Sequence, residues 1–205
     1  MSPRARGRPR SGRADREIHR AALEILGREG YAAASIERIA AEAGVSRPTI
    51  YRRHANRAAL LVAAVEAAFR EANPVVPDTG SAAEDVRILL SNTIRMLRKT
   101  PIGGVVRAIV PELAREADLR RLTRRLLNDR RRLLRDAIVR GIERGEFSSE
   151  RDVELAIDGL LGAIYLRLLF TGRPITGRFA GDLVNEFLLD APGGPAGSRG
   201  QGRSS

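Results

Sequence analysis

Apolar residues recur along most of this 205-residue chain at the three- and four-residue spacing of an amphipathic α-helix. The first segment with this spacing begins at Ala14 and ends at Gly30, and shorter ones cover about 35–44, 46–53 and 56–69. No stretch alternates apolar and polar residues over the length of a β-strand. The pattern therefore predicts an all-α fold.

The helical pattern resumes after a proline-containing break at 73–80. Ser81 and Glu84 form a capping box, a common start signal of a helix. Pro111 is expected to close a short helix, and the segment near 153–170 is apolar on nearly every side, as in a helix buried on most faces. The helices expected in this part cover about 81–99, 101–111, 112–145, 153–170 and 176–189, which makes about nine helices in all.

Residues 43–46, Ala-Gly-Val-Ser, form a tight turn between two short predicted helices. Gly44 suits the left-handed backbone conformation that such a turn needs, and Ala40 is small enough for the two helices to cross closely. Val45 and Ile50 are spaced to lock the second helix onto the first. This is the pattern of a helix-turn-helix, which places one helix in the major groove of DNA.

The second of these short helices is expected to expose a polar face. Pro48 fits inside it if Ser46 is the N-cap, because a proline in the first turn loses no intrahelical hydrogen bond. An ordinary turn between two core helices is the alternative interpretation, and the adjoining arginines favour a DNA-reading helix. The outward polar positions are Arg47, Thr49, Arg52 and Arg53.

The chain has a formal net charge of +11, and Lys99 is the one lysine among its 36 basic residues. Residues 1–13 contain five arginines, no acidic residue and no apolar periodicity, which predicts a disordered basic arm. Such an arm indicates a polyanionic partner, either nucleic acid or an anionic membrane. A solvated tail that reflects arginine-rich coding is the alternative.

Several classes of protein are not expected. The chain has no cysteine, so it cannot form disulfides or thiolate metal sites, and both of its histidines lie in the predicted DNA-binding region. No glycine-rich phosphate loop with a lysine is present, and we therefore expect no enzyme activity, no cofactor and no metal. No apolar run approaches the roughly 18 residues of a membrane span, so the expected location is the cytoplasm.

Residues 14–66, which include GYAAASIERIAAEAGVSRPTIYRRHANRAALLVAAVE, resemble the DNA-binding segment of the TetR family of bacterial transcription regulators. The resemblance implies a helix-turn-helix DNA-binding domain at 14–57. A helical effector-binding and dimerisation domain would follow at 58–190, after the disordered arm at 1–13 and before a flexible tail at 191–205.

The resemblance also implies particular DNA contacts. Ser35 would contact a phosphate, and the third helix would present a set of residues to the major groove and the flanking backbone. That set is Ser46, Arg47, Pro48, Thr49, Tyr51, Arg52 and His54, and Arg57 would join it from the start of the fourth helix. Two positions depart from the family pattern: His54 stands where Phe or Trp is usual, and Arg57 where Lys is usual. His54 either adds a phosphate donor or fills the aromatic packing position.

Residues 6–9, Arg-Gly-Arg-Pro, resemble the core of an AT-hook. In that motif the extended chain lies along the narrow minor groove of A·T-rich DNA, where the negative potential is concentrated. Arg6 and Arg8 would then enter the groove. Nonspecific attraction to phosphates is the alternative.

The second domain carries candidates for an effector pocket and a dimer surface. Arg130 and Arg167 lie on apolar faces, so each would face an acidic effector or a structural partner. The pocket candidates are Thr93, Met96, Val106, Arg130, Tyr165 and Arg167. The dimer candidates on the last two helices are Ala156, Gly159, Ala163, Phe170, Val184 and Phe187.

These features predict a homodimeric transcription regulator that binds double-stranded DNA at a palindromic operator. In the family mechanism, a small-molecule effector bound to the second domain releases a repressor from DNA. Two alternatives remain: an activator of the same fold, and a basic helical protein that binds an anionic membrane surface.

Overall fold

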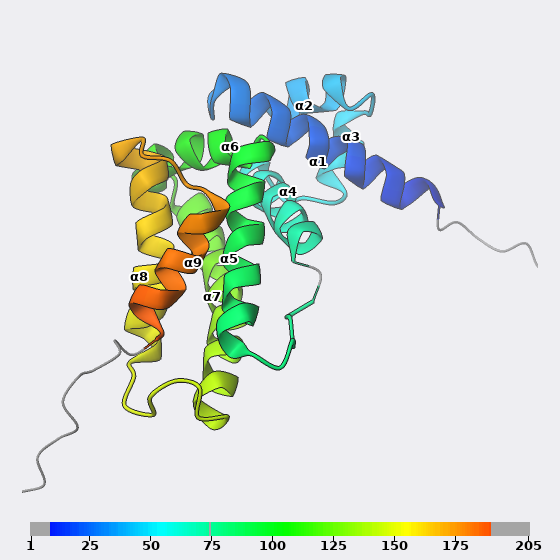
Figure 1. Cartoon of the computed structure of the whole chain (residues 1–205). Coiled ribbons are helices and arrows are strands. Elements are labelled where there is room, and N and C mark those ends of the chain that lie inside the picture. Colours follow the sequence, from blue (N-terminus) through cyan, green and yellow to red (C-terminus); the bar gives the residue numbers. More distant parts are fainter. Residues whose placement is uncertain (1–8, 74, 190–205) are drawn as a thin grey trace, which may run out of the picture.

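The all-α prediction is confirmed by a computed structural model, which describes residues 9–73 and 75–189 and contains nine α-helices and no strand within those residues. A 3-10 helix, η1, and a π-helix, η2, extend two of them (Figure 1). The elements are α1 Pro9–Glu29, α2 Ile36–Glu42, α3 Arg47–Tyr51, α4 Arg57–Ala72, α5 Ala82–Lys99, α6 Ile102–Ile109, η1 Val110–Ala114, α7 Ala117–Glu143, α8 Val153–Leu166, η2 Arg167–Thr171 and α9 Gly177–Phe187.

The helices form two connected parts, which we call the head (α1–α3) and the bundle (α5, α7, α8 and α9). In the bundle, α5 packs against α7 and α9, and α8 packs against α7 and α9. The head lies across one end of the bundle (Figure 1). Helices α4 and α6 connect the two parts, because both pack on α1 while α4 also packs on α7 and α6 on α5.

Local hydrogen bonds explain where several helices begin. The Ser81 hydroxyl accepts the backbone N–H of Glu84, which is one half of the predicted capping box, while the Glu84 carboxylate pairs with Arg87. The Ser35 hydroxyl accepts the backbone N–H of Arg38. Gly30, after the end of α1, has a φ of 89°, a conformation that other residues rarely adopt. Side-chain caps also start α4, α8 and α9, at Asn56, Asp152 and Thr176.

Two predicted boundaries are wrong. Helix α1 begins at Pro9 rather than Ala14, so the end of the predicted disordered arm is helical. Residues 9–13 carry no apolar stripe, and a periodicity argument therefore gave no signal there; a proline is well suited to a first turn. The rest of the arm, with Arg6 and Arg8, and the predicted tail at 191–205 lie outside the described residues.

Pro111 is expected to end a helix, but the chain remains helical beyond it. It lies in the first turn of η1, where its missing N–H costs no hydrogen bond, and the chain continues helically to Ala114. Helix α7 consequently begins at Ala117 rather than near 112. The short turn at 115–116 between them carries Glu116, the N-cap residue of α7.

The head is joined to the bundle by a close backbone contact between α1 and α6. A Cβ atom added to Gly104 would lie 2.4 Å from the carbonyl oxygen of Gly27, and one added to Gly27 would lie 2.8 Å from the carbonyl oxygen of Pro101. Side chains of this size cannot fit, so both glycines are required by the distance between the helices. The buried apolar core runs continuously through this contact, from Ile18 in the head to Leu188 at the end of α9.

We expect Gly104→Ala to lower the free energy of unfolding by about 1–3 kcal/mol, because α1 and α6 must move apart to admit the methyl group. Urea denaturation measures this change. Gly12→Ala in α1 is the control: its Cβ would meet only the Arg16 side chain, at 3.8 Å, so stability should stay or rise by up to about 1 kcal/mol. Unchanged stability of Gly104→Ala would contradict the close approach.

Candidate nucleic-acid interface

The turn between α2 and α3 has the geometry that the sequence predicted. Gly44 has a φ of 65°, and the N–H of Val45 donates to the carbonyl oxygen of Ala40 at 3.0 Å. Ser46 is the N-cap residue of α3, in an extended conformation, and Pro48 lies in the first turn of that helix. The proline therefore costs α3 no intrahelical hydrogen bond.

One side of α3 is anchored and the other is open. Ile50 is fully buried, Ala40 is buried where the two helices cross, and Val45 packs against the same core. On the opposite side Tyr51 is 54% exposed, although it is a large aromatic residue. The exposed residues of this face are Ser46, Arg47, Pro48, Tyr51 and Arg52, and Thr49 is half-buried among them.

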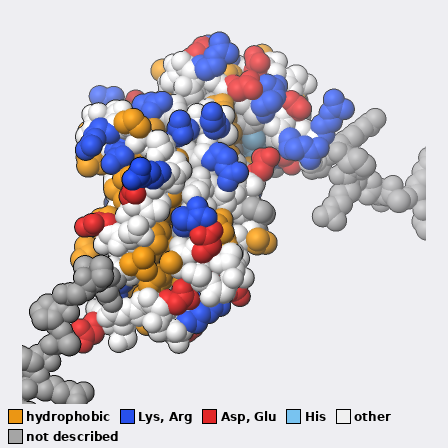
Figure 2. All heavy atoms as spheres, in the orientation of Figure 1, with side chains coloured by type: hydrophobic (Ala, Val, Ile, Leu, Met, Phe, Trp, Pro, Cys, Tyr) orange, Lys and Arg blue, Asp and Glu red, His pale blue; other side chains and the backbone are white. Residues whose placement is uncertain are grey.

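The polar groups of this face are held by weak contacts. Arg47 Nη1 lies 3.2 Å from Glu37 Oε1, and both side chains are about 60% exposed. Exposed pairs of this kind contribute on the order of 0–1 kcal/mol, so a phosphate can displace Glu37 readily. Arg52 Nη2 donates to Thr49 Oγ1 at 3.3 Å. Basic and acidic side chains are interspersed over this end of the molecule (Figure 2).

Ser35 lies at the start of α2 and is half-buried. Its Oγ accepts the backbone N–H of Arg38 at 3.2 Å, so the hydroxyl acts first as a helix cap. Its hydrogen remains available for donation, as a phosphate contact requires.

Arg53 does not lie on the outward face of α3, and this prediction is wrong. Its side chain turns toward α1, where Nε lies 2.5 Å from Asp15 Oδ1, and Nη1 donates to the carbonyl oxygen of Thr49 at 2.8 Å. Helix α3 ends at Tyr51, so helical spacing no longer sets the direction of residue 53. Arg53 therefore clamps α1 to the end of α3.

His54 lies in a packed position between the end of α3 and α1. Its ring centroid is 5.6 Å from that of His19, and the Nε2 atoms of both rings are buried without a hydrogen-bond partner. Burial lowers the pKa of both imidazoles, and the charge of His54 lowers the pKa of His19 further. This placement favours the packing role of His54 over a phosphate contact.

Asn56 and Arg57 connect the head to the start of α7. The Arg57 guanidinium lies 4.0 Å above the Tyr31 ring, and its Nη2 lies 3.4 Å from Glu116 Oε1. Asn56 caps α4 with its Oδ1 and donates through Nδ2 to Asp118 Oδ2 at 3.2 Å. Sequence reasoning missed both acidic partners, because they lie about sixty residues further along the chain.

A partly open cavity of about 170 Å³ lies between α4, α6, η1, α7 and the end of α8, beside the bundle. Three of the predicted pocket residues line it: Val106, Arg130 and Tyr165. Thr93 lines a smaller hollow of about 30 Å³ that shares Arg130 and Tyr165 with the cavity. The remaining cavity residues are mainly aliphatic, and they include Val62, Val65, Ile109, Val110, Leu113 and Leu126.

The two predicted pocket arginines have different surroundings. Arg130 lies 4.9 Å from the centroid of the Phe69 ring, its buried Nε has no hydrogen-bond partner, and burial lowers its pKa. Arg167 does not line the cavity: it stacks 3.5 Å from the centroid of the Phe179 ring and donates to the carbonyl oxygen of Pro174 at 2.8 Å. Met96 also lies elsewhere, in an open groove on the other side of α5.

The residues predicted for the dimer surface divide into two groups. Ala156 and Val184 are buried within the chain, and a Cβ on Gly159 would lie 2.2 Å from the Phe187 ring, so these residues pack α8 on α9 inside one protomer. Ala163 is half-buried. The outward surface of α8 and η2 carries large apolar residues instead: Leu155, Leu166 and Phe170 are 67%, 53% and 77% exposed.

The chain resembles known proteins in both of its parts. Residues 18–64 match the model of the bacterial regulatory proteins of the tetR family, and residues 76–187 match that of the tetracyclin repressor-like C-terminal domain. The HTH-type transcriptional regulator YdeS of Bacillus subtilis is 32% identical over 87% of this chain and 90% of its own length. The DNA-binding transcriptional repressor TetR of Mycobacteroides abscessus is 34% identical over 90% of this chain and 95% of its own.

Solved structures agree with these matches. The TetR family transcription regulator SCO0332 superposes with a TM-score of 0.66 at 30% identity, over 84% of this chain and 95% of its own. The regulator FadR from Bacillus subtilis, solved in complex with stearoyl-CoA, has a TM-score of 0.70 over 84% of this chain and 97% of its own. At 19% identity, FadR shows a common fold alone.

The histidine pair predicts a pH-dependent stability. Both folded-state pKa values lie below the ordinary 6.5, so the unfolded chain binds more protons and the free energy of unfolding falls as the pH drops below about 6.5. We expect His54→Phe to reduce this loss, because one of the two titrating groups is gone. Urea denaturation at pH 7.5 and pH 5.5 measures it. An identical pH dependence in the variant would contradict the buried neutral pair.

Proposed function

The chain belongs to the TetR family and is a transcriptional regulator, and we propose that it is a homodimeric repressor that a small molecule releases from a palindromic operator. DNA binding is supported by the open face of α3, where Tyr51 and Arg47 are exposed on the side opposite the buried Ile50. The cavity of the bundle carries the ligand-binding part.

The DNA contacts follow from the shape of the head. The major groove is wide enough for one helix, and α3 would present the side chains of Arg47, Thr49 and Tyr51 to the base edges. Ser35 and Arg52 flank this face and would bind phosphates. A single short helix covers few base pairs, so two heads on half-sites about one helical turn or a multiple apart would provide the specificity.

The effector that fits the cavity is a compact, mainly apolar molecule. Aliphatic side chains provide most of the lining, and Arg130 is the cationic residue among them. Its buried Nε lacks a hydrogen-bond partner, so an acceptor or anionic group on the effector would satisfy it. Tyr165, whose pKa burial raises, would remain a neutral hydroxyl beside the effector.

The route from the cavity to the head is short. Val110 and Leu113 of η1 line the cavity, and Glu116 lies three residues beyond Leu113, at the start of α7. An effector that widens the cavity would displace η1 and the start of α7, and with them the acidic partners of Asn56 and Arg57. Because these two residues begin α4, which packs on α1, the displacement would change the position of the head.

The exposed apolar surface of α8 and η2 supports dimerisation. Three large apolar side chains exposed on one stretch of the chain are typical of a protein interface. A second copy that covers Leu155, Leu166 and Phe170 would bury this surface by twofold symmetry.

The alternatives have less support. An activator would use the same head and cavity, and the sign of regulation depends on where the operator lies relative to the promoter. Binding to a membrane surface would not explain the helix-turn-helix geometry of α2 and α3. Within residues 9–73 and 75–189, no helix combines the length and apolar character of a membrane span.

We place the protein in the cytoplasm, where the bacterial chromosome is accessible.

Arg47→Ala and Tyr51→Ala should each weaken operator binding by about 1–3 kcal/mol, roughly 5- to 150-fold, because each removes a contact at the centre of the face. Fluorescence anisotropy with DNA from the region flanking the protein's own gene measures this. Arg98→Ala, an exposed arginine of α5, is the control with the same loss of charge as Arg47→Ala. Binding equal to that of wild type in both head variants would contradict the assignment of α3.

Phe170→Glu should convert the protein to a monomer, because a carboxylate in an apolar interface loses its hydration without gaining a partner. Sedimentation velocity gives the mass directly. Val75→Glu is the matched control, since Val75 is 73% exposed and precedes α5, away from α8. A dimer that survives Phe170→Glu would mean that another surface pairs the two copies.

A further inference from the structure

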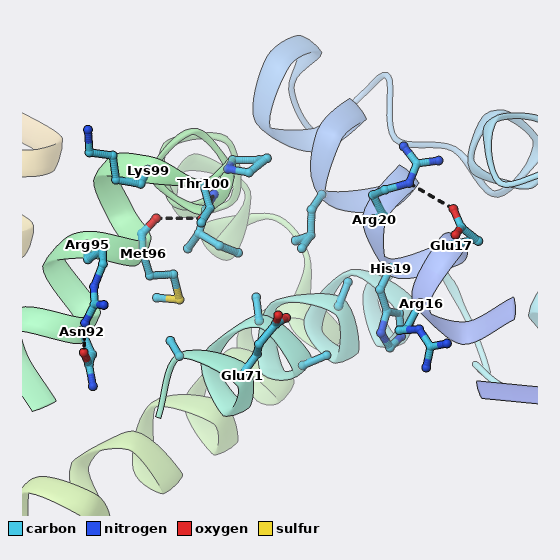
Figure 3. A pocket seen from close by; sticks show the side chains of 17 residues that line it. Arg16, Glu17, His19, Arg20, Glu71, Asn92, Arg95, Met96, Lys99 and Thr100 are labelled. Carbon is cyan, nitrogen blue, oxygen red and sulfur yellow. Dashed lines mark hydrogen bonds and ion pairs between the residues drawn. The ribbon is translucent and has the colours of Figure 1, made fainter. Parts of the chain in front are cut away.

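A second hollow, open to solvent, lies where α1, α4, α5 and the start of α6 meet, and we call it the groove (Figure 3). Its volume is about 740 Å³. It shares no lining residue with the cavity of the bundle. Its floor is hollow because α4 presents small residues there: Ala64, Ala67, Ala68 and Ala72.

The two long walls of the groove are cationic. Arg16 and Arg20 project from α1 on one side, and Arg95 and Lys99 from α5 on the other (Figure 3). Arg20 is occupied by ion pairs with Glu17 and Glu24, at 3.1 and 2.9 Å.

The wall on α5 carries charge that the chain does not neutralise. Arg95 contacts the Asn92 amide oxygen, which is uncharged, and Lys99 forms no ion pair with any described residue. Glu71 of α4 rises between the two walls and is the acidic lining residue that faces this side (Figure 3). An anion at the α5 wall would therefore meet two cations and one carboxylate, that of Glu71.

Apolar surface adjoins this cationic wall. Met96 lies on α5 within the groove, and Leu23 and Ile102 line it from α1 and α6. Together with the alanine floor they form an apolar strip along the groove. The groove thus combines an apolar strip with a cationic end, and this combination is complementary to an amphiphile rather than to a purely ionic ligand.

We propose that the groove binds an anionic amphiphile, with its alkyl chain on the alanine floor and its acidic head group between Arg95 and Lys99. This site shares no lining residue with the cavity. Its ligand would touch α1 of the head and α5 of the bundle at the same time, so it would tie the two parts together.

The test uses the full chain, decyl phosphate below its micelle concentration, and isothermal titration calorimetry. Lys99→Glu should weaken binding about tenfold, since it removes an attractive charge and adds a repulsive one, each worth up to about fivefold at an exposed site. Glu71→Gln should strengthen binding about two- to fivefold, because it removes the nearby carboxylate. Decyltrimethylammonium, the charge-inverted probe, should bind more weakly than decyl phosphate.

Arg98→Glu is the matched control, because Arg98 neighbours Lys99 on α5 but does not line the groove, and the substitution changes the net charge equally. Its affinity should equal that of wild type. The proposal is overturned if Lys99→Glu and Arg98→Glu weaken binding equally, which would indicate general attraction to a basic protein. Binding that neither Lys99→Glu nor Glu71→Gln alters would place the probe in the cavity and also overturn it. Thermal unfolding of each variant verifies the fold.

Discussion

The contact on which the arrangement of the whole chain depends is the approach of two backbones, at Gly27 in α1 and Gly104 in α6. Most helix pairs are held apart by their side chains, whereas here the carbonyl oxygen of one glycine lies 2.4 Å from where a Cβ of the other would be. The head therefore sits on α6 at a distance that side chains do not set. The position of α1 also fixes one wall of the groove and the packing position of His54.

The arginines of the head differ in how strongly neighbouring groups fix their side chains. Arg47 has only an exposed acidic partner, while Arg53 is clamped between α1 and α3 and Arg57 lies between Tyr31 and Glu116. The exposed arginine can exchange its partner for a phosphate at little cost, and the clamped one contributes to the fold. A net charge of +11 thus attracts the whole protein to a polyanion such as DNA. The local partners of each arginine determine whether its side chain is free to bind a phosphate.

Features set by neighbouring residues could be predicted from the sequence. The positive φ of Gly44, the cap at Ser46 and the position of Pro48 depend on a few adjacent residues, and each was found where expected. Helical spacing shows which side of a helix is apolar but not what covers it. For that reason the spacing predicts Ala156 on the dimer surface, although the residue is buried within its own chain. The contact of Arg57 with Glu116 joins segments about sixty residues apart, and no local pattern signals it.

The near absence of lysine has a chemical consequence at the rim of the groove. Guanidinium groups do not react with acyl donors under conditions in which amines do, so Lys99 is the single side chain of the chain that can be acylated as an amine. Acetylation there would remove one of the two cations, Arg95 and Lys99, that line the groove from α5. For the same reason an amine-reactive fluorophore would label one known side chain, in addition to the α-amino group. The composition therefore provides a single-site reporter between the head and the bundle without any engineered residue.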